Sequence, residues 1–512
     1  MVALVGAGPG DPGLITCRGL ELLRRADVVI YDALANPKLL DEAPPQSEKI
    51  DVGKRAGRHR LSQEKINELL VQKAKQTTGP NAKTASLLVV RLKGGDPYLF
   101  GRGAEEVAYL GRHNVRCEVV PGVTAGIAAP ATGGIPVTHR QMASTVTFVT
   151  GHEDPTKAES SVDYAALAAL LRCGGTICFY MGVGRLEAIS QTLQRHGCEP
   201  TTPLAIVQDG TLPTQRVLRT TLGKVTEDRA SAAIAAPAIV VAGQVARIDE
   251  PGLDAFMRRP LFGSQIVVTR TRQQASELSS KLAELGANVL EAPTIELAEP
   301  VDWAPVDRAI KQIKDFDWLV LTSVNGVAAL SRRLDVLKLD ARHLAGLLIA
   351  VIGDATAKAV RTDLGIAADL MPEHFVAEAL AKQLIAQGVA KKKLLLLRAD
   401  IARPALPKLL GDAGAEVLEL TIYETQLAPA LPDTVMEGLQ AGRIDWVTFT
   451  SSSTARNFVE LLGAKRAVLG SIKTASIGPI TSKTMRELGM EVTVEATTSN
   501  IDGLVEAMVE NT

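Results

Sequence analysis

The chain has 512 residues, and its 56 basic and 57 acidic side chains give a formal net charge of −1, so no overall field attracts nucleic acid or an anionic membrane. A hydrophobic fraction of 46% and a charged fraction of 22% are typical of a globular protein, and the length allows about three domains of ~150 residues. The N-terminus lacks a basic, apolar leader and the apolar runs are shorter than the ~20 residues of a membrane span, so we expect a cytoplasmic protein with no membrane or nucleic-acid partner.

The first predicted element is a buried strand, Val2-Ala-Leu-Val, followed by a turn rich in glycine and proline. The glycines lack a Cβ atom where the chain bends, so a ligand can approach the backbone. A dinucleotide-binding loop is one candidate, since Asp32 follows at about the 20-residue distance of a ribose-binding carboxylate. However, Asp11 stands where the third glycine of G-x-G-x-x-G would fall, and its charge would repel a pyrophosphate. A nicotinamide-dependent oxidoreductase is therefore a disfavoured alternative.

Longer sequence motifs are more informative than single glycines, because a whole series of them occurs in a fixed order along the chain. They are Gly6-Ala-Gly-Pro-Gly-Asp-Pro12, Ala26-Asp-Val-Val-Ile-Tyr-Asp32, Gly53-Lys-Arg-Ala-Gly57, Val90-Arg-Leu-Lys-Gly-Gly-Asp-Pro97, Phe100-Gly-Arg-Gly103, Pro121-Gly-Val-Thr-Ala125, Gly134-Ile-Pro-Val-Thr-His-Arg140, Thr150-Gly-His152 and Tyr180-Met-Gly182. Together they resemble the uroporphyrinogen-III C-methyltransferase family, S-adenosylmethionine enzymes of tetrapyrrole biosynthesis, over residues 1–248. The resemblance implies a two-lobed α/β methyltransferase fold that holds S-adenosylmethionine between its lobes, and a homodimer formed through this half.

The family's cofactor contacts map onto loop positions of this sequence, namely Pro9, Gly94, Gly95, Asp96, Leu99, Thr124, Ala125, Met181 and Gly210. The resemblance implies close backbone approach at the two adjacent glycines and apolar cover from Leu99 and Met181. Asp96 either accepts from the cofactor or serves as a turn residue before Pro97. Met181 either covers the cofactor or packs in the core.

For proton transfer, the resemblance implies Asp32 as acceptor and Lys54 as donor. Asp32 ends an apolar strand, where a carboxylate is held rigidly at the edge of a sheet. Arg55, beside Lys54, suits the carboxylates of uroporphyrinogen. For Arg58 and Arg60 a solvated basic loop is an equally good interpretation. His139, Arg140 and His152 could also meet carboxylates or make structural hydrogen bonds.

Two further features of the first half carry expectations. Residues 76–86 look like a polar insertion relative to the family, and we expect a surface loop that leaves the site intact. The cysteines show no C-x-x-C spacing and no neighbouring histidine cluster, so disulfide and metal roles are disfavoured and small buried hydrophobic side chains are expected. The cysteines are Cys17, Cys117, Cys173, Cys178 and Cys198.

The chain changes character near residue 250. Residues 249–262 contain prolines and a glycine between apolar segments, which predicts a linker or a domain crossover. A strand over residues 265–270 and a helix over 275–285 follow. Beyond them the sequence repeats itself: Phe316-Asp-Trp-Leu-Val-Leu-Thr-Ser323 recurs as Ile444-Asp-Trp-Val-Thr-Phe-Thr-Ser451, and Ile352-Gly-Asp-Ala-Thr356 as Ile477-Gly-Pro-Ile-Thr481. We therefore expect two similar α/β lobes with mostly parallel, buried strands.

Residues 263–512 resemble the uroporphyrinogen-III synthase family through fewer sequence motifs. These are Val268-Thr-Arg270, Leu321-Thr-Ser-Val-Asn-Gly326, Leu396-Leu-Arg398, Tyr423-Glu-Thr425, Thr450-Ser-Ser-Ser-Thr454 and Ile477-Gly-Pro479. The resemblance implies ring closure of a linear tetrapyrrole without a cofactor, in which Tyr423 assists departure of the hydroxyl. Further candidate substrate contacts are the hydroxyl residues Ser323, Thr356, Ser452 and Thr481, each of which could instead cap a helix or form a turn.

The two resemblances imply one bifunctional enzyme, because the synthase makes uroporphyrinogen III and the methyltransferase consumes it. Such a chain would convert hydroxymethylbilane to precorrin-2, which feeds sirohaem or cobalamin synthesis. The alternative is an active methyltransferase whose C-terminal half only binds tetrapyrrole.

Overall fold

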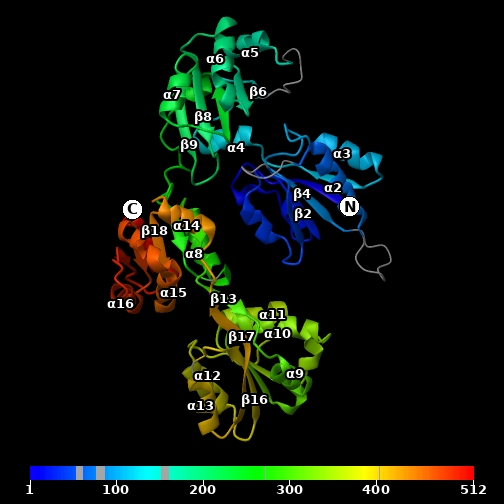
Figure 1. The fold of residues 1–512 in the computed structure, drawn as a ribbon, viewed down its shortest axis with the longest axis vertical. Coiled ribbons are helices and arrows are strands. Elements are labelled where there is room, and N and C mark those ends of the chain that lie inside the picture. The colour runs from blue at the N-terminus through cyan, green and yellow to red at the C-terminus, as the bar shows by residue number, and fades with distance from the viewer. Residues whose placement is uncertain (54–60, 77–86, 152–160, 271, 403) are drawn as a thin grey trace. The chain divides into compact units, whose positions relative to one another are not determined.

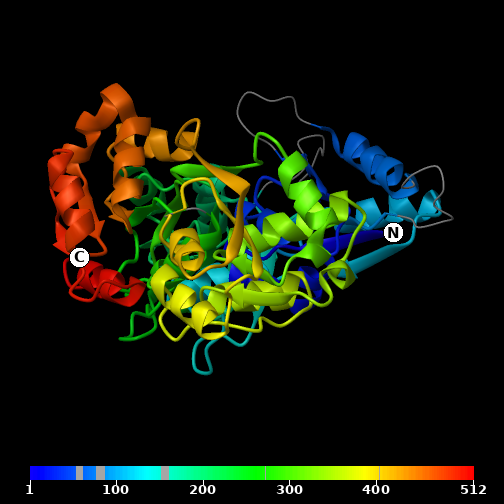
Figure 2. The ribbon, with the colours of Figure 1, turned by 90° about the horizontal axis from the view of Figure 1, so that it is seen from below.

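The computed structural model describes residues 1–53, 61–76, 87–151, 161–270, 272–402 and 404–512. The chain divides into two compact units, one of residues 1–266, 280–289 and 509–512, the other of residues 267–279 and 290–508. The elements of each unit can be followed by colour in Figure 1 and Figure 2. Within the described residues, no helix is both long and apolar enough to cross a bilayer.

The first lobe of the first unit is a parallel sheet with the order β3-β2-β4-β1-β5. The strands are β1 (Val2–Gly6), β2 (Val28–Tyr31), β3 (Glu48–Asp51), β4 (Val89–Lys93) and β5 (Cys117–Val120). Helix α1 (Cys17–Leu23) packs on one face through an apolar cluster, and α2 (Gln63–Lys75) and α3 (Gly103–Arg112) pack on the other through a second cluster. Since all strands run in one direction, the loops that follow them emerge at one edge.

The second lobe of this unit is a mixed sheet with the order β6-β7-β10-β8-β9, in which β6 and β7 are parallel and the other neighbours antiparallel. Helix α4 (Ala125–Thr132) directly follows β5 and packs on this sheet through a cluster that contains Ala129. The other elements are β6 (Val146–Thr150), α5 (Tyr164–Arg172), β7 (Thr176–Tyr180), α6 (Leu186–Arg195), β8 (Pro203–Gln208), β9 (Arg216–Thr221), α7 (Val225–Ser231) and β10 (Ala238–Ala242).

The predicted linker, residues 249–262, consists of turns without a regular helix or strand. Its end is packed, because Leu261 is fully buried and its N–H donates to Leu285 O at 2.9 Å. The predicted domain limits of 1–248 and 263–512 stay a prediction.

Beyond the linker the expected pair of α/β lobes is present. One sheet has the order β12-β11-β18-β19-β20 and the other β13-β17-β16-β14-β15. The first contains β11 (Gln265–Val268), α8 (Arg272–Glu284), β12 (Asn288–Glu291), α14 (Asp433–Gln440), β18 (Trp446–Phe449), α15 (Ser452–Leu462), β19 (Lys473–Ser476), α16 (Pro479–Glu487), β20 (Val494–Glu495) and α17 (Ile501–Val509). The second contains β13 (Ile295–Ala298), α9 (Ala304–Lys311), β14 (Trp318–Leu321), α10 (Val324–Val336), β15 (Leu348–Val351), α11 (Asp354–Asp363), α12 (Ala377–Ala386), β16 (Lys393–Ala399), α13 (Ala405–Asp412) and β17 (Glu416–Leu427).

The internal repeat corresponds to equivalent places in these lobes. Strands β14 and β18 are each followed by a serine whose side chain caps the next helix, Ser323 for α10 and Ser451 for α15. Strands β15 and β19 are likewise followed by α11 and α16, which carry the repeated threonines. The neighbouring pairs β14–β15, β14–β16 and β18–β19 are parallel, as expected, while β13 pairs antiparallel with β17.

The expectation of buried cysteines is correct for only part of the set. Cys178 and Cys198 are buried, and Cys117 is partly buried. Cys17 and Cys173 are exposed, because they stand at the start of α1 and just beyond the end of α5, where helix termini meet solvent. All are free thiols.

Candidate active sites

Two glycine-rich loops of the first unit pair directly with each other. Gly8 N donates to Gly95 O at 3.3 Å, and Gly95 N donates to Gly8 O at 2.7 Å. This bridge joins the loop after β1, which contains Pro9, to the loop after β4. The sequence phrases at positions 6–12 and 90–97 are therefore neighbours in space, although more than one helix separates them in the chain.

Glycine is required where the loops after β1, β4 and β5 meet. A Cβ atom on Gly122 would lie 2.2 Å from Gly95 O, and one on Gly6 would lie 2.5 Å from Gly122 Cα. A Cβ on Gly94 would lie 2.7 Å from Leu34 Cβ. These distances leave no room for a side chain, so the three loops, together with Leu34 of the loop after β2, form one closely packed cluster at the carboxyl edge of the sheet.

Asp96 is a structural turn residue in this cluster. Its Oδ1 accepts from the backbone N–H of Tyr98 at 2.8 Å and of Leu99 at 3.2 Å, and its Oδ2 accepts from Gly122 N at 3.0 Å. The carboxylate thus fastens its own loop to the loop after β5. This is the turn role that the sequence allowed; a contact between Asp96 and a cofactor stays a prediction.

Thr124 and Ala125 stand at the N-terminus of α4, where the structure adds a residue that the sequence analysis had not assigned. Tyr180 Oη lies 2.6 Å from Thr124 Oγ1 and accepts from Gly126 N at 2.7 Å. The Tyr180 ring is also 5.0 Å from that of Phe100, centroid to centroid. Burial raises the pKa of the Tyr180 phenol above its ordinary value. The phenol therefore joins β7 to α4 in its neutral, hydrogen-bonded form.

Met181 and Gly210 occupy the corresponding loops of the second lobe. Met181 has 53% exposure, so the alternative of core packing is wrong for this side chain. Gly210 packs against α4, since a Cβ there would lie 2.2 Å from Ala129 Cβ. The next residue, Thr211, accepts from Asp11 N through Oγ1 at 2.9 Å and so ties this loop to the loop after β1. The predicted cofactor positions therefore lie on a connected set of loops.

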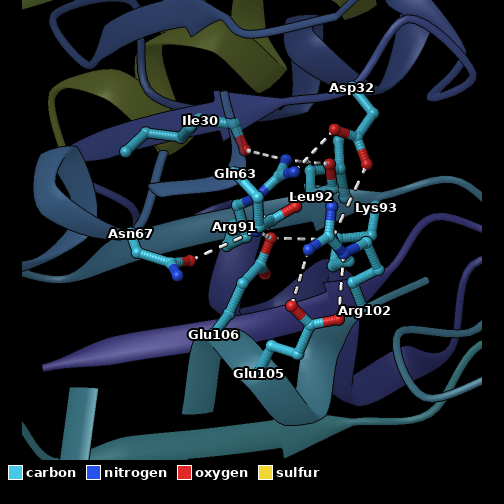
Figure 3. A network of polar contacts seen from close by, with 10 residues as sticks. All are labelled: Ile30, Asp32, Gln63, Asn67, Arg91, Leu92, Lys93, Arg102, Glu105 and Glu106. Carbon is cyan, nitrogen blue, oxygen red and sulfur yellow. Dashed lines mark hydrogen bonds and ion pairs between the residues drawn. The ribbon is translucent and has the colours of Figure 1, made fainter. Parts of the chain in front are cut away.

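Asp32 follows β2 as expected and belongs to a charged network drawn in Figure 3. Its Oδ1 accepts from Arg91 Nη2 at 2.6 Å, and its Oδ2 is 3.9 Å from Lys93 Nζ. Lys93 Nζ donates instead to Glu106 Oε1 at 2.9 Å. Arg91, Lys93 and Glu106 are all buried, whereas the Asp32 side chain has 30% exposure. Asp32 is thus the solvent-facing end of a buried ionic cluster.

The three buried members of this cluster, Arg91, Lys93 and Glu106, were not predicted from the sequence. The available signal was the alternation in β4, where Arg91 and Lys93 share one face of an otherwise apolar strand and so require buried counter-charges. Two predicted partners of the site, Lys54 and Arg55, lie outside the described residues. The same applies to Arg58, Arg60, His152 and residues 77–86 of the surface loop predicted over 76–86.

In the second unit, Tyr423 and Ser323 meet across 100 positions of sequence. Tyr423 Oη lies 3.0 Å from Ser323 Oγ, which also accepts from Gly326 N at 3.0 Å as the cap of α10. The ring packs against the apolar cluster under α10. A hollow of about 70 Å³ lies beside Tyr423 and is also lined by Trp303 and Asn325. The helix-capping role considered for Ser323 is confirmed, and its link to the phenol is an addition.

The other candidate hydroxyl groups are distributed over both lobes. Thr356 lies in the first turn of α11 and is buried. Thr481 occupies the equivalent turn of α16 and is also buried. Ser452 is the first residue of α15, where its Oγ donates to Ile480 O at 3.3 Å and accepts from Thr484 Oγ1 at 2.8 Å. Ser451, not Ser452, is the counterpart of Ser323 in the repeat.

Two tandem units, the first with clustered glycine loops at a sheet edge and the second with a repeated α/β lobe, define a fusion of two modules. Residues 1–226 match the family of tetrapyrrole (corrin/porphyrin) methylases, and residues 276–506 match uroporphyrinogen-III synthase HemD. A porphyrin biosynthesis protein HemD from Ruminiclostridium josui is 36% identical over 509 residues, which are 99% of this chain and 97% of that protein. The chain therefore belongs to the family of porphyrin biosynthesis proteins that join a tetrapyrrole methylase to a uroporphyrinogen-III synthase.

Relatives of the first half alone are closer in sequence. An S-adenosyl-L-methionine-dependent uroporphyrinogen III methyltransferase from Methanosarcina barkeri is 48% identical over 249 residues, or 49% of this chain and 93% of that protein. The crystal structure of a uroporphyrin-III C-methyl transferase from Thermus thermophilus complexed with S-adenyl homocysteine is 38% identical, with coverage of 48% of this chain and 99% of that chain and a TM-score of 0.40.

Proposed function

We propose that this chain is a bifunctional enzyme that closes hydroxymethylbilane to uroporphyrinogen III and methylates that product at C2 and C7 to precorrin-2. Residues 1–248 carry the methylation, residues 263–512 carry the ring-closing lyase reaction, and residues 249–262 join them. The observation that carries the proposal is the match over 99% of the chain to a HemD porphyrin biosynthesis protein. Separate family matches to each half support it.

S-adenosylmethionine, when bound, supplies an electrophilic methyl group to an electron-rich pyrrole carbon. The loops fit such a group, because Gly95 has a φ of +67° with open space where a Cβ would stand, and Met181 presents an exposed apolar side chain. The residues proposed to hold it are Pro9, Gly94, Gly95, Asp96, Leu99, Thr124, Ala125, Met181 and Gly210.

The protein's part in methylation is alignment and proton transfer. Each transfer to a pyrrole carbon releases one proton from the substrate, and Asp32 is the proposed acceptor. Arg91 anchors that carboxylate through Oδ1 and so fixes its position. Lys54 is the proposed proton donor, and Arg55 is proposed to pair with the substrate's carboxylates.

Ring closure needs departure of the hydroxymethyl oxygen and stabilisation of the cation that remains. Tyr423 is proposed to donate a proton to the departing hydroxyl, and its contact with Ser323 orients the phenol. Thr356, Ser452 and Thr481 are proposed to contact the substrate, together with N–H groups at the starts of their helices. No cofactor is proposed for this step.

The product precorrin-2 would feed sirohaem or cobalamin synthesis. We place the reaction in the cytoplasm and the homodimer contact in the methyltransferase half, as further parts of the proposal.

The test is a coupled assay in which the full chain receives hydroxymethylbilane and S-adenosylmethionine. Precorrin-2 should form, and omission of the methyl donor should leave uroporphyrinogen III. Asp32→Ala should stop methylation of supplied uroporphyrinogen III while ring closure continues. Methylation without ring closure would instead support a C-terminal half that only binds tetrapyrrole.

A further inference from the structure

The charged face of β4 is built at the end of an apolar surface. Val89, Arg91 and Lys93 alternate along the strand and therefore share the face that α2 and α3 cover. Val89 belongs to the apolar cluster under these helices, but the next two positions on that face are cations with 1% and 3% exposure. Buried cations of this kind require counter-charges, since their desolvation is expensive.

Glu106 on α3 is the buried counter-charge. Its Oε1 accepts from Lys93 Nζ at 2.9 Å, from Gln63 Nε2 at 3.0 Å and from Arg91 Nε at 3.4 Å. Its Oε2 is buried and has no hydrogen-bond partner among the described residues. Because an unpaired carboxylate oxygen is costly to bury, Glu106 depends for its stabilisation on the contacts at Oε1.

The two cations are divided unequally between the two carboxylates. Asp32 receives Arg91 at 2.6 Å, while Lys93 lies 3.9 Å from Asp32 and 2.9 Å from Glu106. Two positive and two negative groups balance as long as Glu106 is ionised. Without its charge, Arg91 and Lys93 would have only Asp32 as a counter-ion in the cluster.

We propose that Glu106 is a positioning residue for methylation: by holding Lys93 on its Oε1, it keeps the ammonium group 3.9 Å from Asp32 Oδ2, too far to donate a hydrogen bond to the oxygen that accepts the substrate's proton. This inference rests on the proposed role of Asp32 and deepens it. In the transfer, the methyl carbon leaves sulfur and bonds to the pyrrole carbon, and the proton released by the substrate ends on the Asp32 carboxylate.

The charged groups around the cluster come from each element packed against it. Strand β4 supplies Arg91 and Lys93, β2 leads to Asp32, and α3 supplies Glu106. Helix α2 contributes the neutral amides Gln63 and Asn67, which are joined at 3.2 Å. At the start of α3, Glu105 and Arg102 pair with each other at 2.7 Å. Burial, and next the proximity of Arg91, lower the pKa of the Lys93 ammonium, and the charges of Glu106 and Asp32 both oppose that shift.

Glu106→Gln is the first test in the full chain. The amide keeps the shape but not the charge, so Lys93 is released toward Asp32 and stabilises its ionised form. We expect the acidic limb of the kcat–pH profile for methylation to move to lower pH, and kcat to fall about tenfold because a weaker base accepts a proton less readily. Binding of S-adenosylmethionine should stay within about twofold of wild type. Such a change is well under the 1.4 kcal/mol that corresponds to a tenfold change in affinity.

Lys93→Met should shift the acidic limb of the kcat–pH profile in the opposite direction. With this cation gone, Arg91 is the one cation of the cluster left to pair with both Asp32 and Glu106. The ionised form of Asp32 is then less stabilised, so the acidic limb should move to higher pH. The double variant Glu106→Gln/Lys93→Met restores a balanced Arg91–Asp32 pair, and its acidic limb should return to the wild-type position with partial recovery of kcat. A merely structural Glu106 would give no such rescue, so a double variant as impaired as Glu106→Gln overturns the inference.

Two further variants separate this inference from the proposed function. Glu48→Gln removes a surface pair with Lys73 in the same lobe and should leave the profile unchanged. Asp32→Asn should abolish methylation; if it does not, the proposed role of Asp32 fails. If Asp32→Asn is inactive while Glu106→Gln and Lys93→Met both keep the wild-type profile, only the role of Glu106 is overturned. Should Glu106→Gln not fold, by circular dichroism, the upward shift in Lys93→Met alone decides.

Discussion

Tyr423 Oη and Ser323 Oγ lie 3.0 Å apart, and the same serine oxygen caps α10 through Gly326 N. The phenol is therefore held at the N-terminus of a helix, where the aligned peptide dipoles favour a developing negative charge. A proton donor placed there is well suited to assist departure of a hydroxyl group. The arrangement joins β17 to the helix that follows β14.

Tyr423→Phe should reduce the rate of uroporphyrinogen III formation by ~10²-fold or more, the usual contribution of a general acid. The ring and its packing remain, so stability should fall by only about 1 kcal/mol for the lost hydrogen bond. The spontaneous product, uroporphyrinogen I, should rise. Chromatographic separation of the two isomers measures both effects.

Matched controls separate catalysis from helix capping. Ser323→Ala and Ser451→Ala each remove one helix cap, at a cost of ~1 kcal/mol, but only Ser323 contacts the phenol. The first substitution should impair ring closure more than the second. Methylation of supplied uroporphyrinogen III should be unchanged in all these variants, and full synthase activity in Tyr423→Phe would remove the phenol from the mechanism.

Asp96→Ala should weaken binding of S-adenosylmethionine, because the carboxylate fastens two loops through three backbone N–H groups. Each lost bond to a charged acceptor contributes ~1.5–3 kcal/mol, so the melting temperature should fall as well. Asp96→Asn keeps acceptance from Tyr98 and Leu99 but turns an N–H toward Gly122, and its affinity should be intermediate. Isothermal titration measures the affinities, and equal values for wild type and Asp96→Ala would contradict the proposed site.

The local arrangement around Asp32 was predictable in part. An apolar run ending in aspartate predicts a carboxylate at the carboxyl edge of a sheet, and this is where the residue lies. The cluster behind it was not predictable, because Arg91 is 59 positions away and Glu106, which pairs with Arg91 and Lys93, belongs to a helix. Alternation along a strand indicates which residues share a face, but not which helix covers it.

The internal repeat predicted the paired lobes, because similar sequence segments in the same order fold into similar strands and helices. It also aligned Ser323 with Ser451, which is the residue that caps α15; Ser452, named as a candidate substrate contact, is instead the first residue of that helix. Tyr180 was likewise present in a quoted phrase without an assigned role. Its partner Thr124 is 56 positions away, so only the folded chain brings the hydroxyl groups together.

The pH dependence of the first unit should contain a contribution from Tyr180. Burial raises the pKa of its phenol, so the folded state keeps the proton to higher pH than the unfolded chain, where a tyrosine titrates near ~10. The contribution is present below ~10 and is lost as pH rises through the folded value. Tyr180→Phe should therefore show a shallower loss of stability above ~10 than wild type.

Pulse proteolysis in urea can follow this unit through its own fragments. Phe100→Leu removes the neighbouring ring but no titrating group, and it should keep the wild-type pH slope. Equal slopes in wild type and Tyr180→Phe would show that the phenol ionises as freely as in the unfolded chain.

The linker should be a place where the chain can be divided. A cut after Glu250 should give two soluble fragments, with methylation in residues 1–250 and ring closure in residues 251–512, because domains joined by turn-rich segments generally fold alone. All three tryptophans, Trp303, Trp318 and Trp446, lie in the second fragment, so its folding can be followed by fluorescence.

The position of the cut should matter. A cut after Phe262 removes the buried Leu261 and its hydrogen bond to Leu285 from the C-terminal fragment. Burial of a leucine side chain contributes about 1.5–3 kcal/mol, so residues 263–512 should unfold at lower urea than residues 251–512. Equal midpoints would show that the linker's end contributes nothing to the second half, and loss of both activities after the first cut would contradict independent modules.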